Sequence, residues 1–384
     1  MSALPGRLSR RCLALGLSVL LAGCSALPSF LGGGPERPKP AELAANPALI
    51  GVRQAWSAKV GEVGFPLVVQ VNDRQFTLAS GDGTVASFDA DTGSELWRGS
   101  AGGPISAGVG SDGRRAAVVT RENELVAFQD GKVAWRQTLQ GQSHTPPLVA
   151  GGRVFVLGAD RSVSAHDGAT GRRLWFVQRP GEPLVLRQAG VLLAVGDTLV
   201  VGQGGRLAGL DPLTGAVRWE ATVATSRGTN EVERLVDLVA PYSRVGDTVC
   251  VRAFQAAVGC VDAGRGETLW SRRAQGTVGV GGDERHVFGT EADGRLLAWR
   301  RADGELGWST DQFKWRVLTA PLSIGRSVAF GDADGFVHLV SREDGSLVNR
   351  LSTDGSAIAA APVLAGNTLV VVTRNGGIYG FVPN

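Results

Sequence analysis

The chain has 384 residues, of which 43% are hydrophobic and 20% charged, and this composition excludes a wholly disordered protein. Its 55 glycines follow no Gly-X-Y period, which excludes a collagen-like chain and indicates many turns. The formal net charge is +3, and the first 23 residues hold Arg7, Arg10 and Arg11 but no acid, so the remaining chain is neutral. A neutral chain without a Lys/Arg run lacks the charge pattern of a nucleic-acid-binding protein.

The N-terminal segment is typical of an export signal. Basic residues precede the apolar run 12–22, which is too short to span a bilayer as a permanent helix. The run ends in Leu-Ala-Gly-Cys at 21–24, which resembles the bacterial lipobox and implies cleavage before Cys24 and acylation of that cysteine. Ser25 stands where Asp would retain such a lipoprotein in the inner membrane. The resemblance therefore implies an outer-membrane protein, lipid-anchored and facing the periplasm.

A tether follows the cysteine. Residues 25–40 are rich in Pro and Gly and have no apolar period, which predicts a flexible segment. Fully extended, this segment reaches at most about 50 Å. We expect three parts in the chain: a lipoprotein signal peptide at 1–23, a lipidated cysteine and tether at 24–46, and a folded domain at 47–384.

The folded domain is repetitive. A glycine stands four residues before a tryptophan in the pairs Gly93/Trp97, Gly131/Trp135, Gly171/Trp175, Gly215/Trp219, Gly266/Trp270 and Gly304/Trp308. A seventh unit has Gly345 but Asn349 in place of tryptophan, and Trp56 stands near the start without a preceding unit. We call these tryptophan positions, together with Asn349, the markers, and a strand that contains one a marker strand. The markers recur about every 40 residues, a period typical of propeller repeats.

Each unit predicts strands and turns. In the fourth unit, the β-runs 198–201, 206–210 and 216–220 are separated by Gly-containing turns. Apolar residues often precede the marker, as in Leu96-Trp97, so we expect both faces of the marker strands to be buried. No segment has a helical period. These features predict an all-β fold, an eight-bladed β-propeller of four-stranded antiparallel blades.

The two ends of the chain complement each other. The C-terminal β-runs 367–373 and 378–382 stop before any marker strand, whereas 52–60, with Trp56, is a marker strand without a blade. We therefore expect the N-terminal strand to complete the last blade and remove exposed edges. Asn349 lacks the aromatic ring of the other markers and is expected to lie in a more tolerant contact between blades.

Cys250 and Cys260 lie on two β-runs around a turn. A hairpin centred on Gln255 would place them opposite each other. The periplasm is oxidising, which makes a disulfide between them as reasonable as two buried thiols. The sequence leaves both states as alternatives.

The residues that carry chemistry form no recognisable catalytic set. The four histidines fall in different units without ligand spacing, so no metal site is expected. The Asp-x-x-x-Gly-x-x-x-Trp form of several units resembles the repeat of pyrroloquinoline-quinone propellers, whose dehydrogenases are longer and have a vicinal Cys-Cys pair. No two cysteines are adjacent in this chain. We expect no enzyme and no cofactor, with a periplasmic quinoprotein-type dehydrogenase as the alternative.

Two intervals of the repeat are long, those before Trp219 and before Trp270. They contain 179–187 and 226–239, which mix aliphatic and charged residues outside the expected core strands. Departures from a repeat often carry function, because loops vary more freely than blades. A binding surface and simple solvated loops are the two interpretations.

The lipobox, the short tether and the eight units resemble the BamB family, lipoproteins of the outer-membrane β-barrel assembly (BAM) machinery. Leu184-Val-Leu186-Arg187 matches the family's Leu-x-Leu-Arg segment, which binds the POTRA domains of the barrel subunit BamA. Residues 231–237 and 331–338 resemble further family segments. The family has a second Asp two positions after Asp237, where this chain has Val.

The resemblance implies a non-enzymatic scaffold that supports assembly and insertion of outer-membrane β-barrel proteins. Its expected partners are the BamA POTRA domains and other BAM subunits, with unfolded outer-membrane proteins as a further candidate and no nucleic acid. The expected partner-binding residues are Leu184, Leu186, Arg187 and Asp237. If this stretch is extended, the two leucines project from one face and Arg187 turns toward the rim.

Overall fold

The structure is a computed structural model that describes residues 38–179, 184–226 and 235–384. The expected signal peptide and Cys24 lie outside the described residues. All the strands fall in one compact unit, Pro40–Asn384. Within the described ranges, no helix is long and apolar enough to cross a membrane.

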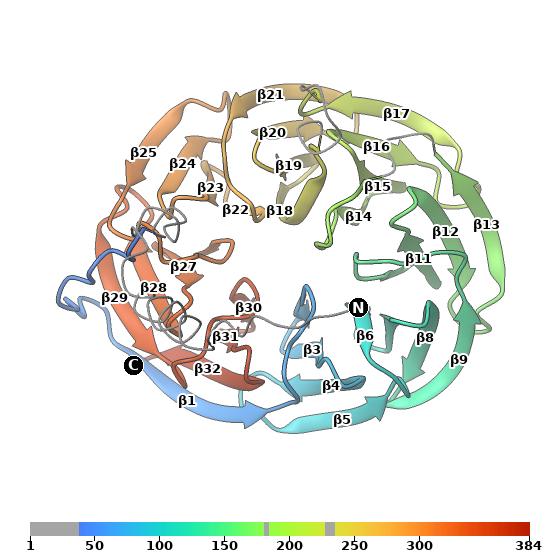
Figure 1. The fold of residues 1–384 in the computed structure, drawn as a ribbon, viewed down its shortest axis with the longest axis horizontal. Helices are drawn as coiled ribbons and strands as arrows, with labels where there is room; N and C mark the ends of the chain where they lie inside the picture. The colour runs from blue at the N-terminus through green and yellow to red at the C-terminus, as the bar shows by residue number, and fades with distance from the viewer. Residues whose placement is uncertain (1–37, 180–183, 227–234) are drawn as a thin grey trace, which may run out of the picture. The chain divides into compact units, whose positions relative to one another are not determined.

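In the described part of the chain, 32 β-strands form eight four-stranded sheets, and neighbouring strands pair antiparallel. Figure 1 shows the sheets as blades around a ring, with the first strand of a blade innermost and the fourth outermost. The predicted eight-bladed propeller is therefore confirmed.

The strands of the first four blades are β2 (Gln70–Asn72), β3 (Gln75–Ala79), β4 (Thr84–Asp89), β5 (Glu95–Ser100), β6 (Ile105–Ser111), β7 (Arg115–Thr120), β8 (Glu124–Gln129), β9 (Lys132–Thr138), β10 (Leu148–Ala150), β11 (Arg153–Leu157), β12 (Ser162–Asp167), β13 (Arg173–Gln178), β14 (Leu192–Val195), β15 (Thr198–Gln203), β16 (Arg206–Leu210) and β17 (Val217–Thr222). Those of the last four blades are β18 (Leu238–Val245), β19 (Thr248–Ala253), β20 (Ala257–Asp262), β21 (Glu267–Arg273), β22 (Val280–Gly282), β23 (His286–Thr290), β24 (Leu296–Arg300), β25 (Leu306–Thr310), β26 (Leu322–Ile324), β27 (Ser327–Gly331), β28 (Phe336–Ser341), β29 (Leu347–Ser352), β30 (Val363–Ala365), β31 (Thr368–Val372), β32 (Gly377–Pro383) and β1 (Val52–Lys59).

The last blade is completed from both ends of this unit. Its strand order is β1-β32-β31-β30, so the N-terminal strand β1 is its outermost strand. The register of β1 and β32 runs from Val52 opposite Pro383 to Lys59 opposite Gly377. This pairing removes the free edges that an open ring would have at its seam. The closure predicted from the two incomplete ends is confirmed.

Burial differs between inner and outer strands. The middle strands β3 and β4 are buried on both faces, because the neighbouring blades cover them. On the outer strand β5, by contrast, Leu96 is 52% exposed. The expectation that both faces of the marker strands are buried is wrong, because blades that radiate from an axis diverge toward the circumference. Only the face that carries the tryptophan is covered there.

The repeated glycine and tryptophan meet across the boundary between blades. Trp135 on β9 donates its indole N–H to the Gly168 carbonyl of the next blade at 2.9 Å. A Cβ on Gly171 would lie 2.6 Å from the same ring, and the φ of 75° also favours glycine there. The glycine of one unit therefore receives the tryptophan of the preceding unit. Equivalent indole-to-carbonyl bonds start from Trp56, Trp175, Trp270 and Trp308.

Asn349 makes a different kind of contact between the seventh blade and the last blade, at the seam where the ring closes. It is buried, and its Nδ2 donates to the Ile50 carbonyl at 2.9 Å while its Oδ1 accepts from Asn46 at 3.0 Å. This contact therefore depends on directed hydrogen bonds, and its expected tolerance to substitution stays a prediction. In the last blade, the N-terminal segment leads into the outer strand, whereas in the other blades a turn with a glycine does so. The contact at Asn349 therefore has no glycine against which an indole ring could pack. The amide retains the hydrogen bond to the next blade.

The segment before β1 lies along β29 on the outside of the ring (Figure 1). The Ala41 N–H donates to the Lys314 carbonyl at 2.9 Å, and Arg316 Nη1 donates to the Ala41 carbonyl at 3.0 Å. Further along, the Leu49 N–H donates to the Val348 carbonyl at 2.9 Å. Contacts with the blades thus begin at Ala41, within the stretch expected as tether.

Strands β19 and β20 form the hairpin expected around Gln255. Cys250 lies opposite Cys260 in its register, and a disulfide joins the two buried residues. Of the two states that the sequence left open, the structure contains the disulfide.

Candidate partner-binding site

The long intervals of the repeat fall in two connections between blades, β13 to β14 and β17 to β18. Strands alternate in direction within a blade, so all connections from a fourth strand to the next first strand emerge on one face. We call it the connection face; the connections 60–69, 139–147 and 311–321 mark it. Residues 180–183 and 227–234 lie outside the described residues, and most of the expected segment 231–237 is among them.

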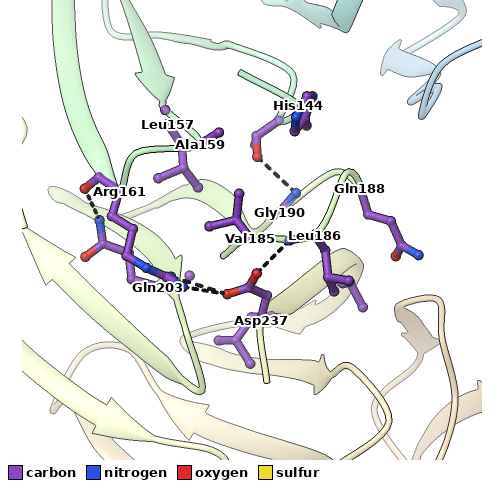
Figure 2. A pocket seen from close by; sticks show the side chains of 15 residues that line it. His144, Leu157, Ala159, Arg161, Val185, Leu186, Gln188, Gly190, Gln203 and Asp237 are labelled. Atoms are coloured by element: carbon purple, nitrogen blue, oxygen red, sulfur yellow. Dashed lines mark hydrogen bonds and ion pairs between the residues drawn. The ribbon is translucent and has the colours of Figure 1, made fainter. Parts of the chain in front are cut away.

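Asp237 joins the two connections (Figure 2). Its Oδ2 accepts the backbone N–H of Leu186 at 2.9 Å. Its Oδ1 lies 3.3 Å from both Nη atoms of Arg161, and Arg161 Nη2 also donates to the Leu184 carbonyl at 3.4 Å. One carboxylate therefore holds the Leu184–Leu186 backbone and a guanidinium at the same time.

This charge pair is shielded from solvent. The side chains of Arg161 and Asp237 are only 10% and 14% exposed. Gln203 Nε2 adds a hydrogen bond to the Arg161 carbonyl at 3.0 Å. Removing one partner of such a pair leaves the other charge poorly solvated. Both carboxylate oxygens of Asp237 are engaged within the chain, one with the Leu186 N–H and the other with Arg161.

The three residues of the Leu-x-Leu-Arg segment occupy different surroundings. Leu184 is 37% exposed, whereas Leu186 is half-buried and lines a small cavity of about 50 Å³. Arg187 is exposed and lines a second, larger cavity enclosed by the inner strands. Residues 184–187 form no strand, so the alternation of an extended chain does not apply to them. Figure 2 shows Val185 and Leu186 on opposite sides of the backbone.

The far end of the segment is also fixed. The Gly190 N–H donates to Thr145 Oγ1 at 3.0 Å, and Gly190 forms a β-bridge with Val239. Burial lowers the pKa of His144, and the positive charge of Arg187 lowers it further. Both effects disfavour the charged form of the His144 imidazole beside Arg187. A segment held at both ends forms a surface that loses little freedom on binding.

Sequence reasoning did not single out Arg161, although a signal was present. Arg161 lies in the turn between β11 and β12, with a φ of 66°. The corresponding turns of other units read Asp82-Gly83, Asp293-Gly294 and Asp334-Gly335, with glycine at positive φ. Most other units have glycine at this position, and Arg161, like Asn123 and Gln255 in two further units, accepts backbone strain there, which is typical of a constrained or functional position.

The segment 331–338, which also resembles the family, lies in the interior. The buried Asp332 accepts from Arg316 Nε at 2.8 Å and lies 2.9 Å from His338 Nε2. Burial acts to raise the pKa of Asp332, but the hydrogen bonds from His338 and Arg316 outweigh it and lower that pKa. This network belongs to the core of the seventh blade. Among the described residues, no group of three or more His, Cys, Asp and Glu side chains is placed to hold a metal ion.

Comparisons with known proteins converge on one family. The family model described as "Outer membrane protein assembly factor BamB" matches residues 81–310. The BamB of Burkholderia pseudomallei is 40% identical over 90% of this chain and 91% of its own length. The BamB of Bordetella pertussis is 36% identical, with 97% of each chain covered.

Solved structures agree on the fold. The crystal structure of BamB from Moraxella catarrhalis has a TM-score of 0.78 at 26% identity, covering 86% of this chain and 99% of that one. The quinohemoprotein alcohol dehydrogenase of Comamonas testosteroni has a TM-score of 0.67 at 16% identity, covering 89% of this chain and 78% of that one. At that identity the second likeness concerns the fold alone.

Proposed function

The chain belongs to the BamB family of outer-membrane protein assembly factors, and on this premise we propose that it binds the POTRA domains of BamA through Leu184, Leu186 and Arg187. In this role it is a non-enzymatic scaffold that, with other BAM subunits, supports the assembly and insertion of outer-membrane β-barrel proteins. The observation that carries the proposal is the shielded Arg161–Asp237 pair, which holds an apolar and cationic segment at the surface.

The physical chemistry of this segment suits a protein interface. Leu184 is exposed in the free protein, so covering it removes apolar surface from water and stabilises a complex by about 1–2 kcal/mol. Arg187 adds a directional charge, and arginine beside apolar anchors is typical of interface hot spots. The fixed backbone reduces the entropy lost on association.

The test measures binding of the isolated POTRA region to Leu184→Ala and Arg187→Ala variants. We expect losses of about 1–2 and 2 kcal/mol of binding free energy with an unchanged melting temperature. Leu213→Ala and Arg326→Ala are matched controls, since both residues are exposed on turns of the opposite face. Wild-type affinity in both site variants would refute the interface. Leu186→Ala should lower binding and melting temperature together, because Leu186 is half-buried.

We also propose that the chain is cleaved before Cys24, acylated there and anchored in the outer membrane on the periplasmic side. The signal peptide would then be 1–23, and the tether from the lipidated cysteine would end where contacts with the blades begin, at Ala41. Mass spectrometry of the membrane-extracted protein tests this, with a diacylglycerol adduct on Cys24 as the expected result. A soluble or inner-membrane protein with an unmodified N-terminus would contradict it.

The non-enzymatic role has a separate test against the quinoprotein alternative. The purified protein, supplied with pyrroloquinoline quinone and calcium, should reduce no dye in the presence of alcohols or sugars. Turnover under these conditions would favour the dehydrogenase.

A further inference from the structure

The connection 311–321, between β25 and β26, presents two large apolar side chains to solvent. Val317 is 75% exposed, more than any other large apolar side chain among the described residues, and Trp315 is 42% exposed. Each of the other eight tryptophans is partly or fully buried. The exposure of these two side chains therefore sets this connection apart from the rest of the described surface.

The loop that carries these side chains is fixed by polar bonds. Between them, Arg316 is buried, and its Nε donates to Asp332 at 2.8 Å. The Trp315 N–H donates to the Asp293 carbonyl at 2.9 Å. The φ angles of Trp315 and Val317, 62° and 53°, are unfavourable for residues with a Cβ, most of all for β-branched valine. The loop thus holds its apolar side chains outward against backbone preference, which is typical of ligand-contacting positions.

The N-terminal segment joins the blades at this same loop. The Ala41 N–H donates to the Lys314 carbonyl at 2.9 Å, and Arg316 Nη1 donates to the Ala41 carbonyl at 3.0 Å. Between Cys24 and Ala41 lie sixteen residues rich in Pro and Gly. A flexible linker of this length spans about 20–24 Å on average. An acyl anchor on Cys24 would therefore keep the loop close to the bilayer surface.

The charges around the loop are paired. Lys314 forms an ion pair with Asp311 at 2.9 Å, and the buried Arg316 pairs with both Asp332 and Asp334. Attraction to anionic lipids should therefore be weak, and contact with a membrane would depend on the apolar side chains. Tryptophan suits such a contact, because its amphipathic ring is enriched at the headgroup level of bilayers.

We propose that this loop is a second membrane contact, in which Trp315 and Val317 enter the headgroup region of the bilayer that holds the acyl chains. The inference rests on the proposed acylation of Cys24 but assigns a separate contact to the folded domain. Two side chains would bind a membrane weakly by themselves, and the tether makes the contact effective by raising the local concentration of lipid.

Such a contact would orient the ring at the membrane. The segment proposed to bind the POTRA domains follows β13, on the side of the ring opposite β25 (Figure 1). The loop could therefore touch lipid while Leu184 and Arg187 remain available to a protein partner.

The experiment places the lipidated full-length protein in vesicles of phosphatidylethanolamine and phosphatidylglycerol, with and without bromine on the acyl chains near the headgroups. Bromine quenches tryptophan fluorescence only at close range, so we expect quenching of the wild type and its loss in Trp315→Phe. Val317→Asp should lower the ratio of bound to free loop about tenfold, because an apolar side chain leaves the contact. Leu213→Asp, at an exposed position of the opposite face, should keep the quenching. High salt should not weaken it.

The same assay separates a failed loop contact from a failed anchor. Vesicle flotation without coupling tests the acyl anchor. A chain that begins at Cys24 can be coupled through that thiol to a maleimide-bearing lipid, because Cys250 and Cys260 are joined in a disulfide. Absence of bromine quenching in such coupled protein would overturn the loop contact, whether or not cells acylate Cys24.

Two further results would overturn the inference. The first is quenching that is unchanged in both Trp315→Phe and Val317→Asp. The second is weaker POTRA binding of Val317→Asp with no bromine quenching of the wild type, which would assign the loop to the protein interface. We expect instead that Val317→Asp leaves the affinity for the isolated POTRA region unchanged, whereas Leu184→Ala lowers that affinity and leaves the quenching intact.

Discussion

The contacts between blades, which we call joints, and the site on the connection face are stabilised by different kinds of interaction. At a joint, a buried indole such as that of Trp135 fills a space beside Gly171 and makes one hydrogen bond. At the site, the shielded pair of Arg161 and Asp237 lies beneath Leu184, which stays exposed. The joint buries its apolar group for stability, while the site uses internal polar bonds to keep an apolar group available. Stability and binding should therefore respond to different substitutions.

Deletion of 52–60 should have the largest effect, because it removes the outer strand of the last blade and reopens the ring. The deletion also removes Trp56, which stacks on Phe76 with ring centres 5.9 Å apart. We expect loss of cooperative unfolding in thermal melts followed by circular dichroism. A deletion of equal length within 25–37 is the control. An unchanged melt after loss of 52–60 would show that closure does not depend on β1.

Trp135→Ala should destabilise the protein by about 3–5 kcal/mol, the usual cost of truncating a buried aromatic side chain. Chemical denaturation measures the change. Trp315→Ala is the matched control, and because Trp315 is exposed its effect should stay within about 0.5 kcal/mol. Equal losses at the two positions would contradict the assignment of stability to the joints.

Asp237→Asn keeps the shape of the side chain but removes the charge that pairs with Arg161. We expect about 2–3 kcal/mol of lost stability, because the guanidinium stays shielded. POTRA affinity should also fall, since the Leu186 N–H exchanges a charged carboxylate acceptor for a neutral amide. A double-mutant cycle with Arg161→Gln measures the coupling. Additive effects of the two changes would refute the pair as the support of the segment.

Asn349→Ala should cost about 1–2 kcal/mol through the lost bonds to Ile50 and Asn46. Asn349→Trp should not restore stability, although tryptophan is the residue of the other joints, because the seam has no glycine cradle for the ring. Denaturation midpoints of the two variants test this. A stabilised Asn349→Trp protein would show that the seam is an ordinary joint.

The smallest expected change in stability is the one caused by mildly acidic pH. Burial is the main cause that lowers the pKa of His338 and of His166. A histidine with a lowered pKa binds fewer protons in the folded than in the unfolded state, so stability falls as pH drops below about 6.5. The lowered pKa of Asp332 acts in another window, where stability is lost only below its ordinary value of 3.8. The melting temperature should be lower at mildly acidic than at neutral pH.

His338→Gln should reduce the difference in melting temperature between neutral and mildly acidic pH, whatever its effect at neutral pH. An equal difference in this variant and the wild type would remove His338 as a source of the pH dependence.

The repeat allowed the blades to be predicted because each unit carries its own pattern of strands, turns and marker residues. Closure was predictable for the same reason, since β1 and the C-terminal strands are two parts of one unit. The exposure of Leu96 was not, because alternation along a strand does not reveal whether a neighbouring blade covers it. The partners of Asn349 were not predictable either, since Asn46 and Ile50 precede the repeat.

The sequence by itself determined the number of blades, their closure and the place where the repeat is interrupted, because these follow from local patterns. Only the tertiary structure decided how the interruption is used. Arg161 reaches Asp237 from another blade, 76 positions away in the chain, and Arg187 turns into a cavity whose wall includes Arg374 and Val317. Such contacts depend on how the blades are arranged around the ring, and no local pattern specifies which side chains from distant units meet there.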